Sequence, residues 1–121
     1  MVEFVFMLPI MLMLIWGVVE VSRAWLMVGM VAEATRNGAR TGAVTPTTAG
    51  DVFNSSPAYA AIDAMLNAAG LSSGATRSVT CTTPCRPDSQ VQATVTVPFS
   101  SALLPWITPV NIRETTTMRH E

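Results

Sequence analysis

The two cysteines, Cys81 and Cys85, are the residues of this chain best suited to covalent chemistry. They lie four positions apart in the stretch CTTPC, where a disulfide would close a small loop. Such a bond would indicate an oxidising compartment outside the cytoplasm; two free thiols are the alternative. Zinc is a weaker alternative, because it normally takes four ligands and the other candidate ligand, His120, is distant.

Groups for catalysis are scattered along the chain. Nucleophilic catalysis needs a nucleophile, a base and an orienting group in one place, but His120 lies next to the C-terminus, where we expect a frayed end. Asp51, Asp63 and Asp88 are separated and resemble acids on solvated loops and helix faces. Basic and aromatic residues are not interleaved as in nucleic-acid-binding proteins. We therefore expect no enzyme, cofactor, metal, nucleic acid or small-molecule substrate.

The longest charge-free stretch lies at the N-terminus, between Glu3 and Glu20. Its 16 residues, Phe4–Val19, are apolar apart from one proline and one glycine. A full membrane span usually needs about 20 such residues, and a second uncharged stretch, Ala24–Ala32, follows Arg23. Because an unpaired charge is costly inside a bilayer, this composition predicts a helix surrounded by lipid or by other helices.

We expect this helix to run from Val2 to about Arg40. Methionine and leucine favour helices, and Pro9 lies near the start, where its missing N–H costs least. At about 1.5 Å per residue the helix would be about 60 Å long, so it should emerge from a bilayer and carry the rest of the chain. Gly42 is the favoured terminator, with Gly38 as the alternative.

Polar residues mark the middle of the expected helix. Glu20 and Arg23 lie three residues apart on one face, so they can pair and extend to the membrane surface. Trp16 and Trp25 flank them, as aromatic residues at membrane interfaces do. A cleaved signal peptide is disfavoured, since no basic residue precedes the run and no A-x-A site follows. A buried helix of a soluble protein is disfavoured because the run is apolar on all sides.

The charged residues and the cysteines predict opposite orientations of the chain in the membrane. Arg23, Arg36 and Arg40 all follow the apolar run, which predicts a cytoplasmic C-terminal part. A disulfide between Cys81 and Cys85 would require the opposite side of the membrane. We follow the cysteines and expect an extracytoplasmic C-terminal part.

The middle of the chain changes from a helical to a strand pattern. Ala58–Ala69 is expected to form a short helix that ends at Gly70. Ala75–Thr82 and Gln90–Phe99 are rich in Thr and Val, and the second alternates apolar and polar residues as a half-buried strand does. Thr82–Ser89 is the expected hairpin connection.

Two further strands are expected near the C-terminus. Ile107–Ile112 suggests a third strand and Arg113–Glu121 a last one, while prolines restrict the strands to sheet edges or short pieces: Pro98, Pro105 and Pro109. The fold class is therefore α+β, with a long hydrophobic N-terminal helix followed by a small antiparallel sheet and one short helix. Residues 1–42 form the membrane and assembly helix, and residues 43–121 form an extracytoplasmic head.

An ordered set of motifs resembles the N-terminal segment of TadE-like proteins, which are minor pilins or pseudopilins of the tight-adherence (Flp) pilus. The resemblance covers about 42 N-terminal residues, and it returns in the alternating strand Val91–Val97 and at the C-terminal end of the chain. Its motifs here are Glu3-Phe4, Leu8-Pro9, Gly17-Val18-Val19-Glu20, Arg23-Ala24, Ala34-Thr35-Arg36-Asn37-Gly38-Ala39-Arg40 and Met118-Arg119-His120-Glu121.

The resemblance implies a prepilin that a dedicated membrane peptidase cuts before the apolar helix, leaving a glutamate near the fifth mature position. Glu3 is third in this numbering. Its carboxylate would neutralise the α-ammonium group of a neighbouring helix in a low dielectric; the alternative is an acid favoured by the helix dipole. The implied assembly residues are Glu3, Phe4, Pro9, Gly17, Glu20 and Arg23.

We therefore expect a minor pilin or pseudopilin of a tight-adherence, type IVb pilus. It would be anchored in the inner membrane by a single pass and then reach the pilus at the cell surface, with roles in initiation, tip formation or assembly. The expected partners are other pilin and minor pilin subunits, the inner membrane, the prepilin peptidase and the pilus assembly platform. The rival is a single-pass extracytoplasmic accessory protein that never enters a filament.

Overall fold

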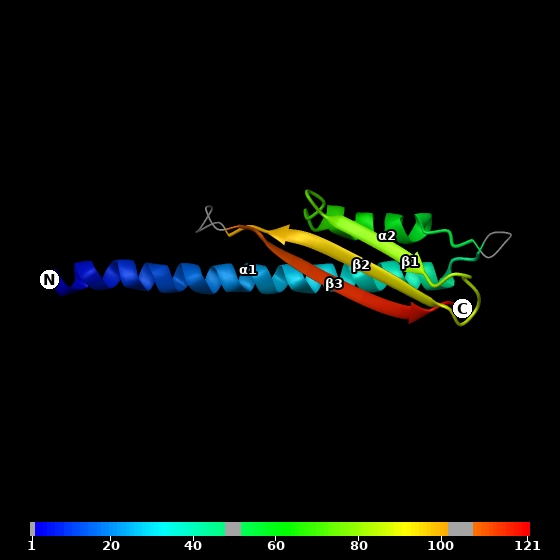
Figure 1. Cartoon of the computed structure of the whole chain (residues 1–121). Helices are drawn as coiled ribbons and strands as arrows, with labels where there is room; N and C mark the ends of the chain where they lie inside the picture. The colour runs from blue at the N-terminus through cyan, green and yellow to red at the C-terminus, as the bar shows by residue number, and fades with distance from the viewer. Residues whose placement is uncertain (1, 48–51, 102–107) are drawn as a thin grey trace.

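One long helix dominates the molecule (Figure 1). In the computed structural model, which describes residues 2–47, 52–101 and 108–121, helix α1 runs from Val2 to Val44 without interruption at Pro9. Its N-terminal half projects away from the rest of the chain, and its C-terminal half lies under the sheet. The predicted rod is therefore present and continues four residues beyond the expected end at Arg40.

The remaining elements form a small head on the C-terminal half of α1. Helix α2 spans Ser56–Ala68, and the strands β1 (Thr76–Cys81), β2 (Gln90–Phe99) and β3 (Val110–Arg119) follow. They form an antiparallel sheet in the order β1-β2-β3. The predicted α+β class, with a long apolar helix, one short helix and a small antiparallel sheet, is confirmed.

The core lies between the sheet and the two helices. The alternating residues of β2, from Val91 to Val97, point inward and are almost completely buried. Ile62 of α2 and Val31 of α1 have no exposed surface. Strand β2 therefore contributes one complete apolar face, as its alternation predicts.

The buried face of α1 is built from small residues, and this explains why the predicted helix end was wrong. A Cβ atom added to Gly38 would collide with Cγ1 and Cδ1 of Ile62, and one added to Gly42 would lie 3.0 Å from Cγ1 of Val91. These glycines therefore allow α2 and β2 to approach the helix closely. They do not terminate α1, which continues to Val44.

The C-terminal part of the sheet also corrects the prediction. One continuous strand, β3, replaces the two expected at Ile107–Ile112 and Arg113–Glu121. All ten of its residues pair with β2, so no turn separates the two predicted pieces. Pro98 lies in the central strand and not at an edge, near the end of β2 and opposite Asn111. The predictions for residue 107 and Pro105 lie outside the described residues.

Candidate functional site

The N-terminal half of α1 is an apolar surface that the other described parts of the chain leave uncovered. Every side chain from Glu3 to Trp16 is exposed, with Phe4 at 76% and Met13 at 78%. A soluble monomer rarely exposes a contiguous apolar patch larger than a few hundred Å². Among the described residues, α1 is the helix that is long and apolar enough to cross a membrane.

Two of the predicted assembly residues form a polar cluster at the end of this surface. Arg23 Nη1 donates to Glu20 Oε2 at 2.9 Å, as the spacing predicts. Ser101 Oγ, just beyond β2, donates to Glu20 Oε1 at 2.8 Å. The side chain of Glu20 is 17% exposed and that of Arg23 is 53% exposed. The head is therefore hydrogen-bonded to α1 at Glu20. Ser101 and Glu20 are 81 positions apart, so no local pattern in the sequence predicts this contact.

The other predicted assembly residues lie along the bare part of the helix. Glu3, Phe4 and Pro9 are exposed, and among the described residues no atom outside the helix lies within 4 Å of the place where a Cβ on Gly17 would stand. Glu3 is 17 residues from Glu20, which is about 25 Å along a helix. The structure therefore brings Glu20 and Arg23 together and leaves the others free for groups outside this chain.

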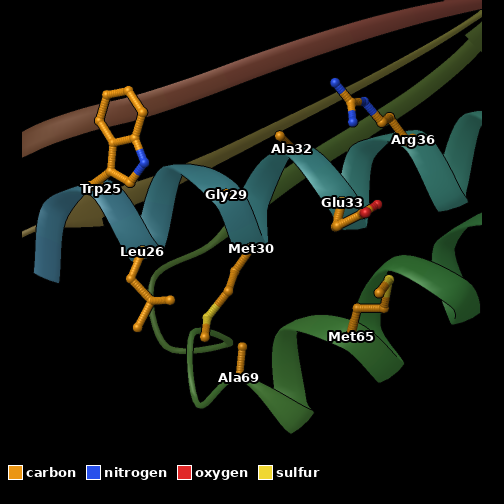
Figure 2. A pocket seen from close by; sticks show the side chains of 9 residues that line it. All are labelled: Trp25, Leu26, Gly29, Met30, Ala32, Glu33, Arg36, Met65 and Ala69. Atoms are coloured by element: carbon orange, nitrogen blue, oxygen red, sulfur yellow. The ribbon is translucent and has the colours of Figure 1, made fainter. Parts of the chain in front are cut away.

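An apolar groove lies beyond the polar cluster, between α1 and the C-terminal end of α2 (Figure 2). It has a volume of about 650 Å³ and is lined mainly by Leu26, Gly29, Met30, Met65 and Ala69. Leu26 and Met30 point from α1 towards Ala69 in the close view. A second hollow of about 230 Å³ shares these side chains and reaches Leu71 and Phe99. Sequence reasoning missed both hollows, because they depend on where α2 and β2 end.

A family comparison identifies the part of the chain that carries this surface. Residues 1–40 match the model of the family described as TadE-like protein. This N-terminal segment is TadE-like. Neither the curated proteins nor the solved structures give a significant match to the chain.

The TadE-like segment includes the whole bare half of α1, the polar cluster residues Glu20 and Arg23, and all of the buried half except its last four residues. The TadE-like family is structural and not enzymatic, and the segment and the apolar helix fit a pilin-like, membrane-anchored protein. The tail motif from Met118 to Glu121 lies outside the match, so its resemblance to the family stays a prediction.

The cysteines lie at the opposite end of the head from the polar cluster. Cys81 and Cys85 are joined by a disulfide, with their Cα atoms 5.7 Å apart, and Cys85 is buried. This bond closes the start of the β1–β2 connection, next to the C-terminal end of the chain (Figure 1). Within the described ranges, no group of three His, Cys, Asp or Glu side chains is placed to hold a metal.

His120 does not lie in a frayed end, contrary to the prediction. It is 4% exposed, and its Nε2 lies 3.0 Å from the carbonyl oxygen of Thr45. Its backbone N–H donates to Ser89 O at 2.7 Å, and the N–H of Glu121 donates to Ala43 O at 3.0 Å. The tail therefore ties the β1–β2 connection to the C-terminal end of α1 and serves packing.

Proposed function

We propose that this chain is a minor pilin or pseudopilin subunit of a tight-adherence, type IVb pilus. The observation that carries the proposal is a TadE-like match that covers nearly all of α1, a helix with an apolar N-terminal half exposed to the outside and a C-terminal half built into the head. Before assembly the bare half anchors the chain in the inner membrane. It then exchanges lipid for neighbouring helices during pilus initiation, tip formation or assembly.

The head stands on the extracytoplasmic side in this proposal. The disulfide between Cys81 and Cys85 supports that side, because such bonds persist in oxidising compartments. The partners are other pilin and minor pilin subunits, the assembly platform, and a prepilin peptidase that processes the precursor. Adhesion and secretion would be functions of the pilus to which this chain contributes.

Glu3 is the assembly residue with the clearest physical role. It is exposed at the start of α1, and the next acid along the helix is Glu20. A lone carboxylate among packed apolar helices needs a positive partner. The α-ammonium group of a processed neighbouring helix supplies one, and the pair fixes the axial register of the two subunits.

Incorporation into sheared pili tests the proposal. A tagged chain carrying Glu3→Gln should remain in the inner membrane and be lost from the sheared pilus fraction, because the register pair is gone. Asp88→Asn is the matched control, since it removes one carboxylate charge from the head, where Asp88 is exposed, and it should be incorporated normally. Normal incorporation of Glu3→Gln would contradict the role of Glu3.

The rival function is a single-pass anchored accessory protein that never enters a filament. The same fractions separate the two functions: the unmodified tagged chain should be found in sheared pili, and a chain that stays wholly in the membrane would favour the rival. The intact mass of the chain from membranes should show a removed leader, and its mass before and after reduction should report the Cys81–Cys85 bond.

A further inference from the structure

The membrane-side end of the head carries an apolar rim around α1. Trp25 is 80% exposed, Leu26 60% and Val110, at the start of β3, 63%. Phe99, at the end of β2, lines the smaller hollow together with Leu26. The end of β2 and the start of β3 lie towards the bare half of α1 (Figure 1). The sheet therefore presents apolar residues at the level where the helix leaves the head.

The length of the bare part of α1 indicates where the rim lies relative to a bilayer. From Glu3 to Glu20 the helix rises about 25 Å, which is less than the hydrocarbon core of about 30 Å. From Glu3 to Trp25 it rises about 33 Å. A hydrocarbon core with Glu3 at one boundary therefore extends past Glu20 and ends close to Arg23, and Trp25 lies just beyond it in the headgroup region.

The polar groups inside this interval are satisfied within the chain, as a low-dielectric environment requires. Glu20 is paired with Arg23 and accepts a hydrogen bond from Ser101. The hydroxyl of Ser22 donates to Val18 O at 2.8 Å. The guanidinium of Arg23 is still half-exposed, so it can reach lipid phosphates.

We infer that the β2–β3 end of the head is itself seated in the lipid headgroup region before assembly, with Phe99 and Val110 in contact with lipid. The partner of this rim is the bilayer that surrounds α1, because the hydrogen bond from Ser101 to Glu20 holds the sheet end beside the spanning segment. This inference rests on the membrane anchoring in the proposed function. Beyond that anchoring, it fixes the depth and orientation of the head relative to the membrane.

Depth-dependent fluorescence quenching tests the inference in the full chain reconstituted in phosphatidylcholine–phosphatidylglycerol vesicles. One variant carries Phe99→Trp as its sole tryptophan, with Trp16, Trp25 and Trp106 changed to Phe. The matched control carries Phe53→Trp in the same background, because Phe53 packs near Gly42 at the distal end of the head. A headgroup-level quencher should reduce the emission of Trp at 99 about twofold or more and leave Trp at 53 unchanged, since interfacial tryptophans lie at that depth.

Three other results would overturn the inference. Equal, weak quenching at both positions would mean that the head stands away from the membrane. A third variant keeps Trp25 as its only tryptophan. If the quencher reduces the emission of this variant but not that of the Phe99→Trp variant, α1 is embedded while the sheet is not. That result would contradict the seating of the head in the headgroup region and leave the membrane anchoring of the proposed function intact. Chains that fail to float with the vesicles would overturn both. The Phe99→Trp chain should give the same far-UV circular dichroism and the same unfolding midpoint as the Trp25-only variant, which keeps every residue of the sheet.

Discussion

The two halves of α1 share one helical backbone, but one half exposes large apolar side chains and the other packs small ones against the head. The difference follows from whether the packing partners lie within this chain or outside it. The bare half carries large residues such as Phe4, Leu12 and Trp16, which stay exposed in the isolated chain. The buried half carries small residues, Gly38 and Ala39 among them, where the head packs closely. Large apolar residues suit lipid or separate helices, whereas small ones allow a head of about 80 residues to fold directly on the helix.

Deleting a large side chain should therefore destabilise the head only where that side chain packs against it. Ile62→Ala removes a fully buried side chain that packs on Gly38, so it should lower the free energy of unfolding of the head by about 2–5 kcal/mol. Leu12→Ala removes a similar side chain from the bare half and should leave head stability unchanged. Denaturant unfolding in mild detergent, followed by circular dichroism, measures both. Equal losses would contradict the division of the helix.

Adding a side chain to a glycine sharpens the same contrast. Gly38→Leu should cost about 3 kcal/mol, near the upper end for overpacking, because its Cβ would collide with Ile62. Gly17→Leu places the same side chain in open space on the bare half and should leave the unfolding midpoint of the head unchanged or slightly raised. A tolerant Gly38 would mean that α2 does not pack on α1 as described.

Removing the disulfide should affect the head but not the anchoring. The double substitution Cys81→Ser/Cys85→Ser opens a very short loop, and chain entropy gives about 2 kcal/mol for such a loop. Thermal unfolding should shift to lower temperature while the chain still floats with vesicles. An unchanged melting curve, with unreduced wild type alongside, would show that the bond adds no stability.

The smallest effect is expected where α2 meets β1 through exposed charges. Asp63 Oδ2 lies 2.8 Å from Arg77 Nη2, and both side chains are more than a third exposed. Asp63→Asn should therefore cost only about 0.2–1 kcal/mol, less at high salt. Comparing the unfolding midpoints of this variant and wild type at low and high salt measures the effect, and a loss as large as that of Ile62→Ala would contradict it.

Local patterns were sufficient for elements whose own residues specify them. The alternation in Gln90–Phe99 predicted β2 with its observed bounds, and the charge-free run predicted the exposed apolar helix. Patterns failed where a residue's role depends on a distant partner. Gly42 resembles a helix terminator until Val91 is packed against it, and His120 resembles a frayed residue until Thr45 is placed beside it.

The site shows the same limit. The pair of Glu20 and Arg23 was predictable from a spacing of three, but the hydrogen bond from Ser101 depends on where β2 ends. The groove beside Leu26 and Met30 needs α2 as its second wall. Sequence alone therefore indicated that α1 needs lipid or other helices around it. The structure was needed to locate the apolar rim of the head, at the end of β2 and the start of β3, beside the bare half of α1.

The most direct test of the account is the behaviour of the purified full-length chain when detergent is removed. A helix with an uncovered apolar half should either enter added vesicles or associate through that half, so sedimentation analysis should find no stable monomer in plain buffer. A chain that remains monomeric and monodisperse without detergent or lipid would contradict the account.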